Sequence, residues 1–193
     1  MAKPDTKPSC FIIMPITTPL ALAEQYKGDA DHFTHVLEHL FVPALENAGF
    51  KAVSPKSTGS PVIQAEIIKQ LSSCELVLCD MSILNPNVFF EFGIRTALDR
   101  PVALVVDDKT TPLPFDTNIL NFHSYDSSLT PWSLEEQKQK LLAESIAQHQ
   151  CRVEIRKARS HLHKDDPKYN EKVEEIKECL RKKHGLPYVP GGC

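Results

Sequence analysis

Short apolar runs alternate with segments of helical periodicity along the first 130 residues. An apolar run of four to six residues bounded by proline, glycine or polar residues is typical of a buried strand. Apolar residues that recur every three or four positions are typical of an amphipathic helix. On this basis we expect strands at 10–14, 50–53, 75–80, 101–106 and, at a sheet edge, 121–125, and helices at 31–48, 61–71 and 88–98.

Proline and glycine refine the first helix. Pro43 lies inside residues 31–48 and is expected to kink the helix, because its ring removes a hydrogen-bond donor and crowds the carbonyl of His39. Gly49 is the expected stop.

The alternation of strands and helices predicts an α/β protein. We expect a three-layer, doubly wound, flavodoxin-like fold whose mostly parallel sheet has about five strands, followed by C-terminal helices. In such sheets ligands bind outside the carboxyl ends of the strands, near the switch in strand order. Residues 15–19, 54–60, 80–87 and 107–116 are expected there.

Two further helices are expected after residue 130. Ser133 and Glu136 have the spacing of a capping box at the start of one. Helix 167–184 carries an apolar stripe that must pack on the core or on a second subunit, and we expect a homo-oligomer. The predicted organisation is a disordered N-terminus (1–9), an α/β domain (10–150) and a basic helical extension (151–193).

Composition and charge narrow the class. The chain has 193 residues, 41% hydrophobic and 24% charged, as in globular proteins. No apolar run reaches membrane-spanning length, and residues 1–9 do not resemble a signal peptide, so a cytoplasmic protein without a membrane partner is expected. The net charge of −3 divides into −7 for residues 1–150 and +4 for 151–193, and an acidic body argues against nucleic acid as a partner.

Residues 79–95 carry the strongest candidate chemistry. Asp80 ends a predicted strand and Glu91 follows in the next helix, so both carboxylates are expected to converge on one spot. Asn85 and Asn87 between them suit sugar hydroxyls or phosphate. A carboxylate in such a site can attack C1 of a ribose or stabilise the oxocarbenium ion as the base departs.

The residues around Glu91 are expected to have opposite effects on its pKa. Val88, Phe89 and Phe92 are expected to raise its pKa by desolvation, while Arg95 is expected to lower it. The alternative, which spacing alone favours equally, is an exposed Glu91–Arg95 helix pair of little energetic importance.

Other polar residues give weaker signals. His32, His35 and His39 share a helix face, but no carboxylate or cysteine stands at a matching distance, so a polar face or oligomer contact is favoured and no metal site is predicted. Asp107, Asp108 and Asp116 suit a divalent ion or a ribose, or simply solvent. Phe115 is expected to cover the cleft and stack on a base, and the alternative is that residues 114–116 form a plain turn that needs no ligand.

Four segments carry a resemblance to a known family. They are FIIMPI (11–16), PALENAGF (43–50), CDMSILNPNVFFEFGIRTAL (79–98) and LPFD (113–116). Over roughly residues 10–126 the chain resembles the nucleoside 2-deoxyribosyltransferase-like superfamily, which is structurally similar to TIR domains. The long middle motif is the specific one.

The resemblance implies an activity and a set of site residues. It implies cleavage of the N-glycosidic bond of NAD or a related nucleoside or nucleotide, as in bacterial antiviral defence effectors, with NAD as substrate and no cofactor. Glu91 would be the catalytic residue, and Asp80 would contact the sugar or support the leaving base. The segment matching Met14, Pro15 and Ile16 would line the pocket. With the residues inferred from the sequence itself, the expected substrate-binding set is Met14, Pro15, Ile16, Asn85, Asn87, Arg95, Phe115 and Asp116.

The sequence departs from the family pattern in three places. The usual Glu-Leu-Gly is Glu91-Phe92-Gly93, the single tryptophan Trp132 lies outside the core, and the C-terminal residues that complete a deoxyribosyltransferase site have no match. Two alternatives therefore stay open: a non-catalytic nucleotide-sensing module of the same fold, and a TIR-like domain that signals by oligomerisation.

Overall fold

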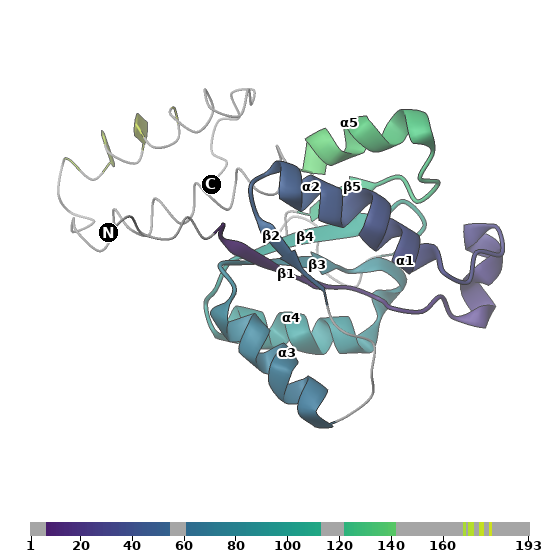
Figure 1. Cartoon of the computed structure of the whole chain (residues 1–193), viewed down its shortest axis with the longest axis horizontal. Helices are drawn as coiled ribbons and strands as arrows, with labels where there is room; N and C mark the ends of the chain where they lie inside the picture. Colours follow the sequence, from purple (N-terminus) through teal and green to yellow (C-terminus); the bar gives the residue numbers. More distant parts are fainter. Residues whose placement is uncertain are drawn as a thin grey trace.

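The structure is a computed structural model that describes residues 7–54, 61–112 and 122–141, together with six separate residues between 168 and 178. Its centre is a fully parallel five-stranded sheet in the order β2-β1-β3-β4-β5 (Figure 1). This order and the helices on both faces confirm the predicted doubly wound, flavodoxin-like α/β fold. The strands are β1 (Ser9–Ile13), β2 (Lys51–Val53), β3 (Leu76–Asp80), β4 (Val102–Asp107) and β5 (Phe122–Tyr125).

Helices cover both faces of the sheet (Figure 1). One face carries a continuous rod, built from α1, η2 and α2, with α5 beside it; α3 and α4 cover the other. Two short 3₁₀ helices, η1 and η3, follow β1 and β3. The bounds are η1 (Leu20–Tyr26), α1 (His32–Val36), η2 (Leu37–Phe41), α2 (Val42–Asn47), α3 (Pro61–Ser73), η3 (Ser82–Leu84), α4 (Pro86–Ala97) and α5 (Pro131–Leu141).

Pro43 changes the rod in a way that its position alone does not reveal. Instead of a sharp kink, η2 is a turn of π-helix, in which the Val42 N–H donates to the carbonyl of Leu37, five residues back. The wider turn carries the helix past the proline, which has no N–H to donate. Gly49 ends the rod as predicted, with a φ of 83° that favours glycine.

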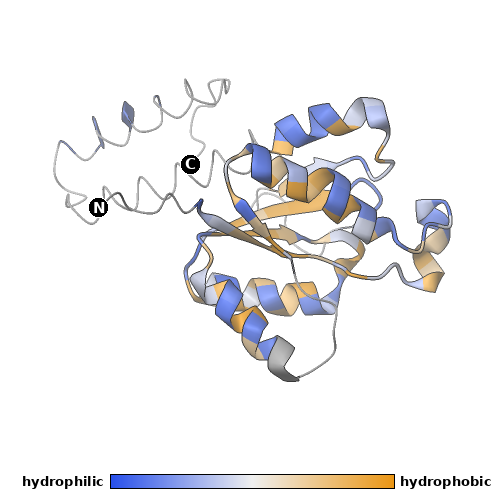
Figure 2. Cartoon of the chain, in the orientation of Figure 1, coloured by the Kyte–Doolittle hydropathy of each residue, from blue (hydrophilic) through white to orange (hydrophobic). Residues whose placement is uncertain are grey.

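Each face of the sheet packs its own apolar layer (Figure 2). In β1, Cys10 and Ile12 face the rod, whereas Phe11 and Ile13 face α3 and α4, and all four are at most 2% exposed. A strand buried on both faces has no polar alternation, which is why the strands were visible as plain apolar runs.

Two helices begin earlier than predicted. α4 starts at Pro86 because the side chain of Asn85 caps it, accepting the N–H of Asn87. α5 starts at Pro131, so Ser133 lies within its first turn and is not the cap; its hydroxyl contacts that of Thr130. Proline is favoured at the first helical position, which decides both starts.

The C-terminal extension is described only in part. Residues 168, 170, 171, 174, 175 and 178 are helical, and the apolar stripe predicted for helix 167–184 lies outside the described residues. None of the helices in the described part of the chain is both long enough and apolar enough to cross a membrane.

Candidate functional site

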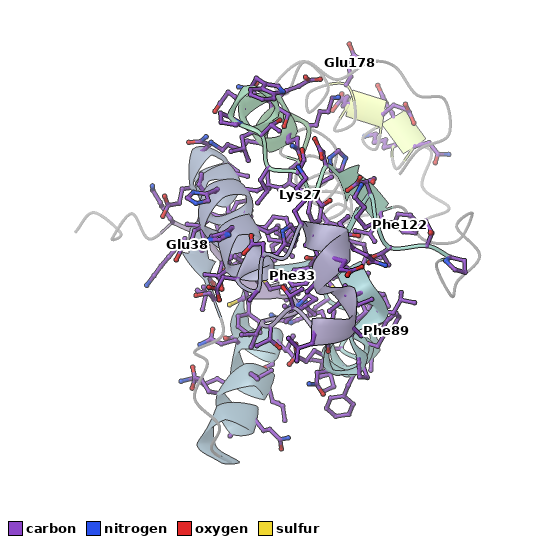
Figure 3. All side chains as sticks on the ribbon, turned by 90° about the vertical axis from the view of Figure 1, so that its right-hand side faces the viewer. Lys27, Phe33, Glu38, Phe89, Phe122 and Glu178 are labelled. Atoms are coloured by element: carbon purple, nitrogen blue, oxygen red, sulfur yellow. The ribbon has the colours of Figure 1, made fainter. Side chains whose placement is uncertain are left out.

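The candidate site lies at the carboxyl ends of the strands, on the side that faces the viewer in Figure 3. The chain leaves β1 toward the rod on one face and leaves β3 toward α4 on the other, so strand order switches between β1 and β3. Ligands of doubly wound sheets bind at such a switch point. Residues 14–19 and 81–85 border it, with 107–110 beside them.

Glu91 is a half-buried side chain in the second turn of α4. Its burial raises the pKa of the carboxyl from 4.5 to about 7, and desolvation is the sole cause. Burial, with the charges of Asp80 and Glu91, also raises the pKa of the Cys79 thiol, which places the Glu91 carboxyl near the end of β3. Within the described residues this carboxyl has no hydrogen-bond or ion-pair partner.

Apolar neighbours explain the desolvation of Glu91. Val88 is buried one turn before it, and Phe89 and Phe92 pack against the same apolar layer. The expected rise in pKa from these residues is confirmed. The expected lowering by Arg95 is wrong, as is the alternative of an exposed Glu91–Arg95 pair.

Arg95 lies at the other end of the sheet and is fully buried. Its guanidinium donates to the carbonyls of Leu71 and Cys74 at the end of α3, and to those of Glu75 and Pro101 just before β3 and β4. Burial lowers its pKa to about 10, so it stays charged at neutral pH. Arg95 is therefore not a substrate contact in this structure, because all its polar groups face backbone carbonyls.

Asp80 is fully buried inside a hydrogen-bond network at the end of β3. It accepts the N–H and the hydroxyl of Ser82, and its second oxygen accepts the hydroxyl of Tyr125 at 2.9 Å. Burial raises its pKa from 3.8 to about 7, although these hydrogen bonds oppose the rise. Both carboxylate oxygens of Asp80 thus accept hydrogen bonds from other residues of the protein.

The two acids do not converge as expected. Leu76 and Leu78 face the rod, so Asp80, two residues further, faces it too and meets Tyr125 there. Cys79 faces α4, the helix that carries Glu91. The helix that follows β3 packs on the face opposite to the Asp80 side chain, and this separates the carboxyls.

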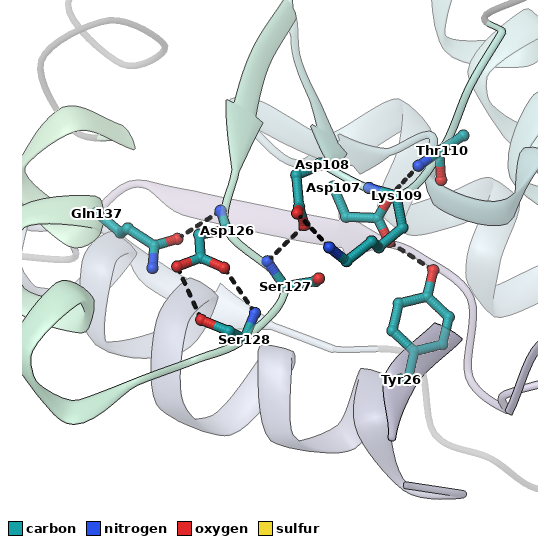
Figure 4. A network of polar contacts seen from close by, with 9 residues as sticks. All are labelled: Tyr26, Asp107, Asp108, Lys109, Thr110, Asp126, Ser127, Ser128 and Gln137. Atoms are coloured by element: carbon teal, nitrogen blue, oxygen red, sulfur yellow. Dashed lines mark hydrogen bonds and ion pairs between the residues drawn. The ribbon is translucent and has the colours of Figure 1, made fainter. Parts of the chain in front are cut away.

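A second network joins the end of β4 to η1 (Figure 4). Asp107 accepts the hydroxyl of Tyr26 and the N–H of Thr110, and its own N–H donates to the hydroxyl of Ser82 at 2.8 Å. Asp108 pairs with Lys109 at 2.8 Å. Asp107 is only 2% exposed and both its carboxylate oxygens accept hydrogen bonds, so in this structure it is neither solvated nor open to an ion or a ribose.

Sequence reasoning missed Tyr26, Tyr125 and Ser82. The tyrosines are separated from their acid partners by 81 and 45 positions. No local pattern signals such a pairing. Ser82 was findable, because Asp-x-Ser after a strand suits a turn in which the carboxylate accepts the N–H two residues on.

The other predicted binding residues have different environments. Met14 is 6% exposed and packs in the core, Pro15 is buried, and Ile16 is 48% exposed at the edge. The side-chain amide oxygen of Asn85 accepts the N–H of Asn87 as the helix cap, while Asn87 itself is exposed. The predicted binding residues Phe115 and Asp116 lie outside the described residues.

The three histidines form no common site. His32 is buried and stacks on Tyr26, whereas His35 pairs with Asp29 at 2.8 Å and stacks on His39. In the described ranges, no cluster of three or more His, Cys, Asp or Glu side chains could hold a metal ion.

No protein-family model matches the chain, and no curated protein is significantly similar in sequence. Among solved structures, a CMP N-glycosidase of Clostridium botulinum, BcmB, is similar to 69% of this chain and 98% of its own. The identity is 16% and the TM-score 0.41. The case for a function therefore rests on the residues and geometry described above.

Proposed function

We propose that the chain cleaves the N-glycosidic bond of a nucleoside or nucleotide, with Glu91 acting at the anomeric carbon of the sugar. One observation carries this proposal. Glu91 is a half-buried carboxyl with no partner among the described residues, and its pKa is raised to about 7 at the ligand-binding edge of the sheet. Such perturbed groups are concentrated at functional sites.

The chemistry suits a carboxyl that is unpaired and partly desolvated. As the C1–N bond breaks, its electron pair leaves with the base, and a carboxylate oxygen bonds to C1 or stabilises the cation there. Water then attacks C1: it displaces the Glu91 carboxylate where a sugar ester has formed, or adds directly to the cation, and either way the free sugar leaves and Glu91 is regenerated. NAD, nucleosides and nucleotides all contain the bond that this step needs.

Neighbouring residues would shape the pocket. Ile16 is an exposed apolar side chain beside the switch point, and Asn87 offers a free amide in the first turn of α4. Asp80 would act as a positioning residue, because its bonds to Ser82 fix the turn that leads from β3 to α4.

The inward orientation of Asp80 favours a second candidate, a nucleotide-binding module without catalysis. With Asp80 bound to Tyr125 and Ser82, Glu91 is left without the second acid expected beside it. Such a module would bind the same ligands and release no base.

The test is base release from NAD and from a panel of nucleosides and nucleotides, measured by chromatography. We expect Glu91→Gln to lose at least about 100-fold in rate while keeping ligand affinity, since the amide keeps the shape and loses the charge. Glu38→Gln, on the exposed side of the rod (Figure 3), is the matched control and should behave as wild type. Wild-type rates in Glu91→Gln would sink the proposal, and binding without any base release would support the module.

A further inference from the structure

Two buried polar atoms have no hydrogen-bond partner in the described part of the chain. They are Oγ1 of Thr18 and Nε2 of His32. Thr18 is 9% exposed and His32 is 3% exposed. Buried side-chain polar atoms almost always have a hydrogen-bond partner, because an unpaired one loses its bonds to water and gains nothing in return. Two on one segment therefore need an explanation.

Both residues belong to the segment that follows β1 at the switch point. Thr18 lies between β1 and η1, and His32 is the first residue of α1. The His32 ring stacks on Tyr26 with 4.1 Å between ring centroids, and the Tyr26 hydroxyl donates to Asp107 at the end of β4. His32 is thus tied to the ligand-binding edge.

The charge around His32 narrows the ligand chemistry. Burial lowers the pKa of His32, and the charges of Asp29, Asp107 and Asp108 only partly oppose this. The neutral imidazole offers no positive charge, and the carboxylates around it repel an anion such as phosphate. A hydroxyl both donates and accepts, so it complements the threonine hydroxyl and either tautomer of the ring.

We propose that Thr18 Oγ1 and His32 Nε2 bind ribose hydroxyls of the ligand. The assignment rests on the proposed function for the identity of the ligand, but not on Glu91 being catalytic. Both atoms are buried, and Tyr26 of η1 stacks on the His32 ring, so the proposal requires this segment to move when the sugar binds. The turn after η1, at Lys27 and Gly28 with φ of 56° and 79°, is where the segment joins α1.

The test is ligand affinity in Glu91→Gln, which is expected to bind without turnover. Calorimetry would use NAD, the four common ribonucleosides, their 2′-deoxy forms and the free bases. Thr18→Val keeps the shape and removes the hydroxyl; His32→Phe keeps an aromatic ring against Tyr26 and removes the nitrogens. Each should weaken ribonucleoside binding at least about tenfold with no fall in melting temperature, since an unpaired buried group is removed. Thr34→Val and His39→Phe, both exposed, are controls that should change neither.

The outcomes separate the two proposals. Unchanged ligand affinity in the two variants would overturn the assignment. A lower melting temperature in the same variants would then show that buried water pairs these atoms. Equal losses for nucleosides and free bases would place the contact on the base and also overturn it. A loss confined to ribonucleosides would locate the contact at the 2′-hydroxyl and support it. If the variants weaken binding but wild type releases no base, only the proposed cleavage fails; if no ribose-containing ligand binds, both fail.

Discussion

Desolvation raises the pKa of two acids, Asp80 and Glu91, where the strands end. Hydrogen bonds oppose this rise at Asp80 but not at Glu91. Asp80 accepts three hydrogen bonds, and Glu91 accepts none from the described residues. Both nevertheless have a pKa of about 7, because Asp80 is buried completely and Glu91 only in part. The two similar pKa values therefore arise differently. At Asp80 complete burial outweighs the hydrogen bonds, and at Glu91 partial burial acts alone.

The pKa of Glu91 predicts how activity and stability change with pH. A carboxylate that acts at C1 must be ionised, so base release should rise with pH through about 7. Between pH 4.5 and 7 the unfolded chain loses the proton of Glu91 before the folded chain does, so this group lowers stability as pH rises. Glu91→Gln should therefore stabilise the protein more at pH 8 than at pH 4.5, by about 1–2 kcal/mol after allowance for solvent screening.

Urea unfolding of wild type and Glu91→Gln at the two pH values measures that difference. Glu38→Gln, with its exposed carboxyl, should show a pH dependence equal to wild type. A stabilisation by Glu91→Gln that is equal at both pH values would contradict the raised pKa.

Asp80→Asn tests the positioning role of the buried carboxyl. The amide can accept from Ser82, but its N–H₂ faces the hydroxyl of Tyr125, which then loses an acceptor. We expect a loss of about 1–2 kcal/mol in stability by thermal unfolding, and a fall in activity smaller than that of Glu91→Gln. Ser82→Ala should act in the same direction through the same network. Unchanged stability would show that the network does not hold the edge of β3.

Among the elements, Arg95 of α4 holds together the end of the sheet opposite the site. Its guanidinium joins the last turn of α3 to the residues that enter β3 and β4. Four carbonyls therefore share one buried cation. The Pro101 carbonyl also accepts the N–H of Val77, and the Cys74 carbonyl also has a long contact with Arg100.

Arg95→Met should destabilise the protein by about 3 kcal/mol, because buried carbonyls lose their hydrogen bonds to a charged donor. The rate per folded molecule should stay near wild type, since the Arg95 guanidinium is bound where the chain enters β3 and β4, whereas Glu91 lies near the carboxyl end of β3. Chemical unfolding and base release measure the two quantities. Arg100→Met is the matched control, because Arg100 is exposed and its hydrogen bond to the Cys74 carbonyl is a long one of 3.5 Å. A selective loss of ligand affinity in Arg95→Met would restore Arg95 as a binding residue.

For the whole molecule, the charges of the two parts of the chain are complementary. Residues 151–193 carry a net charge of +4 and residues 1–150 carry −7. The apolar stripe of Tyr169, Val173, Ile176 and Leu180 lies outside the described residues and needs a surface to cover it. Docking on the core or on a second subunit stays a prediction.

Removal of residues 160–193 should lower the mass in solution if the stripe builds an oligomer, or raise binding of a hydrophobic dye if it covers the core. Light scattering and dye fluorescence measure the two outcomes. Removal of residues 186–193 alone, which leaves the stripe intact, is the control. A truncated chain with unchanged mass, melting temperature and dye binding would contradict the prediction.

The sequence by itself determined the order of the strands and α-helices in the described residues, because each depends on a local pattern. β1, β3 and β4 are buried on both faces, apolar residues recur every three or four positions in the helices, and proline and glycine mark the ends. The 3₁₀ helices η1 and η3 and the π-helical turn η2 were not predicted. The same local pattern placed Glu91 after β3 among apolar neighbours.

Only the tertiary structure decided which side chains meet at the site. Asp80 accepts a hydrogen bond from Tyr125, 45 positions away in the sequence, and Asp107 accepts one from Tyr26, 81 positions away. No local pattern could predict these pairs. A strand buried on both faces also gives no sign of which face its last residue will join. Asp80 lies on the rod side because side chains alternate along β3. Glu91 lies on the opposite side, because the chain leaves β1 toward one face of the sheet and leaves β3 toward the other.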